Sequence, residues 1–196
     1  MTPRQILVPG LSIVLIFLAG LACIRRTPSN LPPLEVGLYT GIEQVAKLDE
    51  SEAQVSARTQ FSPEKLDVTD ADLIALKFTS AVHFKDVGVK AYFRKGRVAL
   101  IEVQEPFAGG LQGKKYQLFP FGSQKGKSWQ EVITREFGSP QNHNEGGRFS
   151  SESLAYSWGD ISYNGNGPNQ LALYRDPEVA QYRQKNFGRV IQFWPK

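Results

Sequence analysis

Cysteine and histidine are scarce in this sequence, and their scarcity removes several kinds of site. The 196 residues include one cysteine, Cys23, and two histidines, His83 and His143. A single cysteine excludes an internal disulfide and a cysteine-rich zinc site, so packing alone must stabilise the fold. The two histidines do not have metal-ligand spacing, and we interpret both as structural or solvated side chains. We therefore expect no metal site.

Motifs for catalysis and for cofactor binding are also lacking. No serine lies in a G-x-S-x-G nucleophile elbow, and the glycine-rich stretches at 109–115 and 165–169 do not fit the P-loop pattern. Glu102 and Glu105 are candidates for an acid and base pair, but carboxylates on a strand more often lie on the solvent side of a sheet. We therefore expect no catalytic residues and no cofactor.

A strong net charge is absent too. The formal net charge is +4, from 23 Lys and Arg against 19 Asp and Glu. Nucleic-acid binding requires a denser and more clustered positive charge, so we expect no nucleic-acid partner. A mildly basic surface is compatible with anionic lipid headgroups or with an acidic protein partner.

The first 24 residues form a membrane or export segment. Residues 6–24 read ILVPGLSIVLIFLAGLACI and carry no charge, a length between that of a signal-peptide core and that of a spanning helix. Cys23 ends this segment in the sequence GLAC, which resembles a bacterial lipobox and makes Cys23 a candidate lipidation site. Three interpretations stay open: a lipoprotein, an uncleaved signal anchor, or a signal peptide cleaved near Ala22. Each places residues 27–196 outside the cytoplasm, behind a proline-rich tether at 25–36.

Residues 37–125 contain the elements of a first α+β unit. Thr40 is a candidate cap for a helix over residues 40–58, and residues 68–76 indicate a second short helix or a strand. The stretch 78–84 alternates as a strand does. Residues 87–93 and 97–103 are rich in β-branched and aromatic side chains, and the turn Arg94-Lys95-Gly96 between them predicts a hairpin.

Residues 126–196 contain the elements of a second unit. In GKSWQEVITREFGSP (126–140), Ser128 and Glu131 form a predicted capping box, an apolar stripe follows, and Gly138 and Pro140 end the helix. A hairpin with Gly159-Asp160 at its turn is expected over 154–165, followed by strands at 171–175 and 188–195. Asp176 and Pro177 predict the start of a short helix between those two strands.

A possible internal repeat supports this division. KGRVALIEVQEP (95–106) and FGRVIQFWPK (187–196) share Gly-Arg-Val, then an alternating strand and a proline. The predicted fold class is therefore α+β, with helices packed on one face of antiparallel sheets, in two similar helix-plus-strands units that follow the N-terminal segment.

The strand pair, the glycine-rich connection, the capped helix ending in FGSP and the strand LAYSW together carry a family resemblance. They resemble small bacterial envelope lipoproteins of the BamE/SmpA type, and also β-lactamase-inhibitor-like proteins, which are built from two such units. The resemblance implies a non-enzymatic module that acts through protein contacts in the cell envelope. This chain is longer than the single-domain envelope lipoproteins, and it lacks the cysteines of the secreted inhibitors.

Two groups of side chains are candidates for binding. The first is the only local basic cluster, Lys114, Lys115, Lys125 and Lys127, and the second is a set of aromatic residues suited to interfaces, Trp158, Tyr163, Tyr174 and Trp194. We expect a membrane-anchored envelope protein that binds or scaffolds an envelope protein partner. The alternatives are a secreted-type inhibitor or lipid-binding module of the same fold, and a carboxylate-dependent hydrolase.

Overall fold

The computed structural model describes residues 34–104, 109–111, 128–145, 151–164 and 167–185. This part of the chain has a mixed α and β fold with largely antiparallel sheets and four α-helices, which agrees with the predicted α+β class. Within these ranges, no helix combines the length and the apolar character that crossing a bilayer requires. The N-terminal segment with Cys23 lies outside the described residues.

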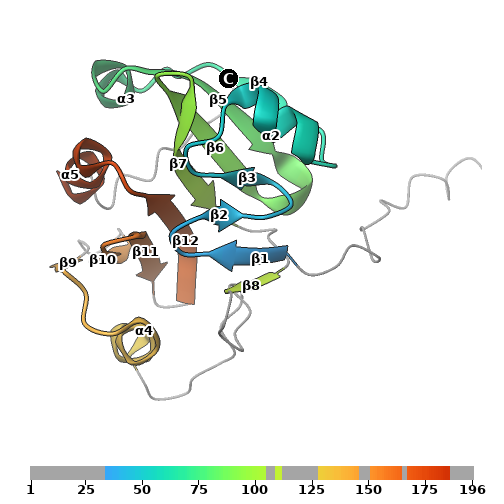
Figure 1. Ribbon diagram of the computed structural model, residues 1–196. Coiled ribbons are helices and arrows are strands. Elements are labelled where there is room, and N and C mark those ends of the chain that lie inside the picture. Colours follow the sequence, from blue (N-terminus) through green and yellow to red (C-terminus); the bar gives the residue numbers. More distant parts are fainter. Residues whose placement is uncertain (1–33, 105–108, 112–127, 146–150, 165–166, 186–196) are drawn as a thin grey trace, which may run out of the picture. The chain divides into compact units, whose positions relative to one another are not determined.

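The main element is an eight-stranded sheet in the order β4-β5-β6-β7-β12-β11-β10-β9, in which every neighbouring pair is antiparallel (Figure 1). The bounds of its strands are β4 Glu64–Leu66, β5 Phe78–Phe84, β6 Val89–Arg94, β7 Arg97–Val103, β9 Asn142–Asn144, β10 Glu152–Tyr156, β11 Gly159–Asn164 and β12 Gly167–Tyr174.

This sheet consists of two four-stranded meanders joined at their last strands. Strands β4 to β7 pair in sequence order, and so do β9 to β12. The junction, which we call the seam, is the antiparallel pair β7 and β12, with Leu100 opposite Tyr174 and Val103 opposite Leu171. Both regions of the sequence therefore build one continuous sheet.

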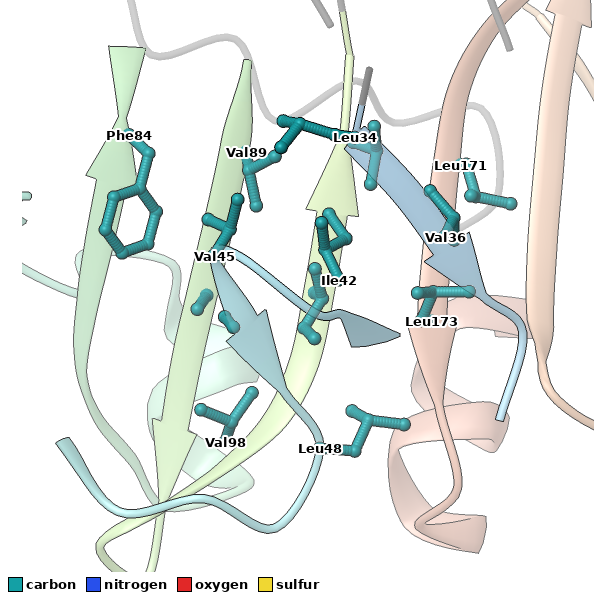
Figure 2. Packing of buried hydrophobic residues seen from close by; sticks show 14 of the residues in the cluster. Leu34, Val36, Ile42, Val45, Leu48, Phe84, Val89, Val98, Leu171 and Leu173 are labelled. Carbon is teal, nitrogen blue, oxygen red and sulfur yellow. The ribbon is translucent and has the colours of Figure 1, made fainter. Parts of the chain in front are cut away.

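A second, four-stranded sheet covers part of one face, in the order β3-β2-β1-β8. Its strands are β1 Leu34–Gly37, β2 Gly41–Ile42, β3 Ala46–Lys47 and β8 Gly109–Leu111, and β1 runs parallel to β8. Figure 2 shows side chains of this layer, such as Val36 and Ile42, packed toward Leu171 and Leu173 of the large sheet. Strand β1 thus occupies the last residues of the segment 25–36 that the sequence assigned to a tether.

Helices lie on both faces of the large sheet, which corrects the expectation of one helical face. Helices α2 (Glu52–Arg58) and α4 (Trp129–Phe137) bury Val55 and Ile133 in the same cluster as Ile101. Helices α3 (Ala71–Ala75) and α5 (Pro177–Lys185) instead bury apolar side chains with Leu100, the neighbour of Ile101 on β7. Successive side chains of a strand point to opposite faces, so the two helix pairs cover opposite faces. The sequence shows a helix's apolar stripe, but not which face that stripe will meet.

The helix expected from Thr40 is wrong in its first half. Residues 41–47 form β2, β3 and the turn between them, and the helix begins only after Ser51. Ser51 accepts a hydrogen bond from the Gln54 backbone N–H, and the Gln54 side chain accepts one from the Ser51 N–H, a complete capping box. Gly41 explains why residues 41–47 do not form a helix. Its φ of +108° is not helical, and a Cβ at this position would lie 2.5 Å from the Ala46 carbonyl oxygen.

The other local predictions fare better. Ser128 caps α4 by accepting from the Glu131 N–H, one half of the predicted capping box, and Gly138 has positive φ at its end. The hairpin of β6 and β7 turns at Lys95-Gly96, both with positive φ, as the sequence predicted. Asp176 accepts from the Glu178 N–H at the start of α5, as expected. Residues 68–76 resolve into α3, which Asp70 caps.

The second hairpin turns at Ser157-Trp158, two residues earlier than predicted. Tyr156 pairs with Gly159, which is already the first residue of β11. Trp158 is buried in this turn because its ring stacks on Tyr156 with centroids 4.9 Å apart. Gly159 is required by close strand packing, since a Cβ there would meet the Ala172 carbonyl oxygen at 1.9 Å. The predicted strand 188–195, and with it the second copy of the proposed repeat, lies outside the described residues.

Candidate functional site

A surface cavity of about 190 Å³ lies at one end of the seam, and we call it the seam pocket. Strands β7 and β12 are antiparallel, so the start of β7 meets the end of β12 at this point. The turn between β6 and β7 and the residues that lead from β12 into α5 complete the walls. Three apolar residues of the lining, Leu48, Val98 and Ala99, are buried or half-buried. The pocket therefore takes its walls from both meanders.

Basic side chains dominate the lining of the seam pocket. Its four cations are Arg94, Lys95, Arg97 and Arg175, and its two carboxylates are Asp49 and Asp176. All of the cations except Arg94 are exposed. Lys95, at the tip of the hairpin, has no ion-pair partner in the described part of the chain. An excess of guanidinium groups at a cavity is typical of carboxylate or phosphate recognition.

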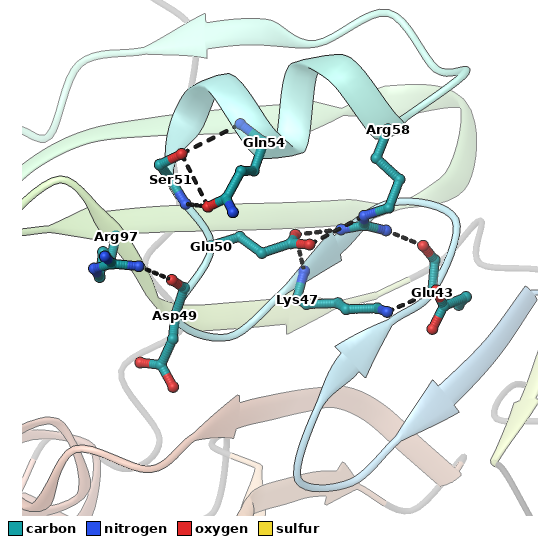
Figure 3. A network of polar contacts seen from close by, with 8 residues as sticks. All are labelled: Glu43, Lys47, Asp49, Glu50, Ser51, Gln54, Arg58 and Arg97. Carbon is teal, nitrogen blue, oxygen red and sulfur yellow. Dashed lines mark hydrogen bonds and ion pairs between the residues drawn. The ribbon is translucent and has the colours of Figure 1, made fainter.

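The wall formed by Asp49 is held in place by backbone contacts. The Asp49 N–H donates to the Val98 carbonyl at 2.9 Å, and the Val98 N–H donates to the Glu50 carbonyl at 2.8 Å. Arg97 Nη1 donates to the Asp49 carbonyl oxygen at 2.7 Å (Figure 3). Asp49 has a φ of +69°, which aspartate tolerates better than most residues. The turn before α2 is thereby joined to the start of β7.

The same turn is tied to α2 by Glu50. The Glu50 carboxylate accepts from the Lys47 backbone N–H at 2.9 Å and from Arg58 Nε at 3.1 Å. Arg58 also donates to the Glu43 carbonyl oxygen (Figure 3). These contacts join the β2–β3 hairpin, the turn at Asp49 and α2 into one unit, so the pocket wall is preorganised.

Arg94 is the buried member of the pocket lining. Its side chain is 7% exposed and pairs with Asp176 and Glu178 at the start of α5. Burial by itself would lower the pKa of Arg94, but Glu178 and Asp176 raise it above its ordinary value. The buried Nε of Arg94 has no hydrogen-bond partner in the described residues. One buried guanidinium donor of Arg94 is therefore left without an acceptor among the described residues.

A second group of ionisable residues is completely internal, and we call it the Arg183 cluster: Tyr92, Glu102, Asp160 and Arg183. Arg183 on α5 donates to both Asp160 carboxylate oxygens, at 2.9 and 2.8 Å, and to Glu102 Oε1 at 3.1 Å. The Tyr92 hydroxyl donates to Glu102 Oε2 at 2.8 Å. Burial by itself would lower the pKa of Arg183, but Asp160 and Glu102 raise it.

Glu102 therefore does not lie on the solvent side of a sheet, as the sequence suggested, since it is 3% exposed. Its expected companion Glu105 lies outside the described residues. The Arg183 cluster ties α5 to one strand of each meander, β7 and β11. We interpret it as a structural link, because its carboxylates are occupied by Arg183 and it does not line the seam pocket.

His143 takes part in a third, smaller group on β9, β10 and β11. The Tyr163 hydroxyl donates to Glu152 Oε2 at 2.6 Å, and His143 Nε2 lies 3.3 Å from both of these oxygen atoms. Burial and the neighbouring Glu152 raise the pKa of Tyr163. Among the described residues, no group of three or more His, Cys, Asp or Glu side chains is placed to hold a metal ion.

The other histidine is part of the large sheet. His83 on β5 is half-buried and lies opposite Glu64 and Lys90 on its neighbouring strands. Burial and the positive charge of Lys90 lower the pKa of His83. The two histidines are therefore on separate strands of different meanders.

Three of the four aromatic residues proposed as binding anchors are not exposed. Trp158, Tyr163 and Tyr174 are 4%, 4% and 1% exposed, so their rings belong to the core and form no surface patch. Among the described residues, the large apolar side chains that are exposed are Tyr39 and Ile74, at 52% and 53%. The alternating pattern shows which strand positions are aromatic. It does not show that the helices and the small sheet cover both faces of the large sheet. The lysine cluster, Lys114, Lys115, Lys125 and Lys127, and also Trp194 and Cys23, lie outside the described residues.

Sequence reasoning missed the seam pocket entirely. Its lining comes from three separate stretches of the chain, 48–49, 94–99 and 175–176, and only the second contains a predicted turn. The basic residues Arg94, Lys95 and Arg97, which lie in and next to the predicted hairpin turn, are the local signal for this pocket in the sequence. In comparisons with known proteins, no family model, no curated protein and no solved structure matches this chain.

Proposed function

We propose that this protein is a non-enzymatic envelope component that binds or scaffolds a protein partner at a membrane surface. The observation that supports it is the strand order of the large sheet, in which two four-stranded meanders meet at their last strands. Each meander follows a helix with a serine N-cap, Ser51 for α2 and Ser128 for α4. This arrangement is compatible with two similar helix-plus-strands units, the organisation on which the resemblance to β-lactamase-inhibitor-like proteins rests.

The placement of the charged residues favours a protein that acts through contacts at its surface. The buried acids Glu102 and Asp160 bind Arg183 and so hold α5 on the sheet, whereas the cations at the seam pocket are mostly exposed. A continuous eight-stranded sheet with helices on both faces is a rigid platform. Such a platform suits a scaffold, in which the relative positions of contact residues must be kept.

Photo-crosslinking in the full chain tests the binding role. A photoreactive amino acid is placed at Tyr39 or at Ile74, which are exposed on different elements, in the protein expressed in a bacterial host. We expect one position to give a discrete adduct with an envelope protein and the other to give none. Adducts at neither position, or identical adducts at both, would contradict a specific scaffold.

The membrane attachment is tested separately by mass and by membrane partition of the wild type beside Cys23→Ala. A diacylated Cys23 at the mature amino terminus, lost together with membrane association in the variant, is the result expected of a lipoprotein. An unmodified Cys23 in a full-length membrane protein would identify a plain anchor. A fully cytoplasmic protein would contradict the proposed location.

A further inference from the structure

The seam pocket has the charge and the size for a small anion. Its lining holds four cations against two carboxylates, and Glu178 adds one more negative charge from outside the lining through its contact with Arg94. The balance stays positive with all of these groups counted. Its volume of about 190 Å³ is below the roughly 300–1,000 Å³ of a site for a drug-sized ligand. It therefore fits a single charged group.

Arg94 contributes a buried positive charge to the wall of the seam pocket. Buried donors in folded proteins almost always have an acceptor, and leaving one unpaired is unfavourable. The Nη atoms of Arg94 are paired with Asp176 and Glu178, but its buried Nε has no acceptor in the described residues. This Nε has almost no exposed surface, so Arg94 acts on a ligand in the pocket through its positive charge and not through a direct hydrogen bond.

The exposed cations of the pocket can turn to a ligand at little cost. Lys95 has no ion-pair partner in the described chain, and Arg97 uses Nη1 for the Asp49 carbonyl, which leaves its other donors. Arg175 pairs with the Asp49 carboxylate, but both side chains are largely exposed, and exposed ion pairs contribute little. Asp49 is thus a competitor that an incoming anion can replace at Arg175.

We propose that the seam pocket is a binding site for a phosphate group, held by Lys95, Arg97 and Arg175 beside the buried positive charge of Arg94. Guanidinium groups recognise phosphoryl oxygens through paired hydrogen bonds, and the lining holds two exposed guanidinium groups and one ammonium. The buried apolar residues Leu48 and Val98 also line the pocket. The same chemistry accommodates a free phosphate or the headgroup of an anionic phospholipid.

The test uses the full chain in phosphatidylcholine nanodiscs and follows the Arg94 Nε–H signal by NMR. Inorganic phosphate is added against sodium chloride at matched ionic strength. We expect a saturable shift of the Arg94 signal and of the Gly96 and Arg175 amides with phosphate alone. Absence of a saturable shift in all lipid conditions would overturn the proposal, as would an equal response to chloride.

Matched variants separate the pocket from general charge. Lys95→Asn with Arg175→Gln removes two pocket charges, and asparagine tolerates the positive φ of residue 95. Lys65→Gln with Lys85→Gln removes two exposed charges elsewhere. We expect the pocket variant to bind phosphate at least about tenfold more weakly, because each lost charge-assisted hydrogen bond contributes roughly that factor or more. Equal weakening in both variants would refute a defined site.

A third variant should act in the opposite direction. Asp49→Asn removes the carboxylate that occupies Arg175 and keeps a residue suited to positive φ. We expect several-fold tighter phosphate binding from this variant, and weaker binding would contradict the arrangement. In nanodiscs that contain phosphatidylglycerol, a shifted Arg94 signal without added phosphate would identify a lipid headgroup as the source. An unshifted signal there, with phosphate still binding, would identify a free anion.

Discussion

The two faces of the eight-stranded sheet are stabilised in different ways. One face carries an apolar cluster that continues into the small sheet and into α2 and α4, with most of its members less than 5% exposed. The other face, beneath α3 and α5, has a smaller apolar cluster next to the Arg183 cluster. Neighbouring residues of β7 show the contrast, because Ile101 and Val103 face the apolar side and Glu102 faces Arg183.

This difference shows that a residue of this sheet can be fully buried without being hydrophobic. Glu102 and Asp160 are as deeply buried as the leucines on the other face. A buried charge is tolerated only with a partner and with hydrogen bonds, so the polar face depends on one cation. The apolar face depends on many small contributions. The polar face should therefore be the more vulnerable to a single substitution.

The largest expected effect comes from Arg183→Leu. The substitution leaves Glu102 and Asp160 buried without a cation, and loss of one partner of a buried pair typically costs about 3–5 kcal/mol. We expect the free energy of unfolding, measured by urea denaturation, to fall by about that amount or more. Neutralising both acids in the same chain, with Glu102→Gln and Asp160→Asn, should restore part of the loss. A triple variant no more stable than Arg183→Leu would show that packing of α5, and not charge, is decisive.

The next largest effect tests the apolar face. Leu173→Ala removes a fully buried side chain of β12, and such truncations cost about 2–5 kcal/mol through lost burial and a residual cavity. The variant should show the same slope of unfolding free energy against urea concentration as the wild type, but its unfolding midpoint should lie at a lower urea concentration. A larger loss of unfolding free energy than in Arg183→Leu would show that the apolar face, and not the polar face, is the more vulnerable to a single substitution.

Two tyrosine-to-phenylalanine substitutions compare the faces directly. Tyr92→Phe removes the hydrogen bond to the buried Glu102 and should cost about 1–3 kcal/mol. The Tyr156 hydroxyl on the apolar side is buried without a hydrogen bond of normal geometry, although Thr134 acts to lower its pKa. Tyr156→Phe should therefore be neutral or slightly stabilising at neutral pH. Equal losses of unfolding free energy in the two variants would contradict the proposed difference between the two faces.

The smallest expected effect is on pH dependence. Burial raises the pKa of Tyr156 from 10 to about 12. The unfolded chain loses this proton first as the pH rises, so the contribution is complete below pH 10 and is lost between pH 10 and 12. Tyr156→Phe should reduce the alkaline loss of stability in thermal melts at these pH values. A curve of midpoint against pH identical to that of the wild type would contradict the raised pKa.

Local features were predictable where local rules decide them. The turn at Lys95-Gly96, the cap at Ser128 and the start of α5 at Asp176 were each visible in a few adjacent residues. The false helix from Thr40 came from an apolar pattern that also fits two short strands. In that region, Gly41 packs so closely against Ala46 and Ile101 that tertiary contacts decide the backbone. The second hairpin turns at Ser157-Trp158, and not at the predicted Gly159-Asp160, for a similar reason. Stacking on Tyr156 buries Trp158 in the turn.

The sequence by itself determined the α+β class, the bounds of α4, the start of α5, the hairpin of β6 and β7, and the shortage of cysteine and histidine. These depend on backbone conformation and composition, which act over a few residues. Only the tertiary structure decided that two meanders share one sheet, that Glu102 pairs with Arg183, and that Asp49, Arg94 and Arg175 meet at the seam. Those outcomes depend on which strands become neighbours, and strand pairing brings together residues far apart in the chain.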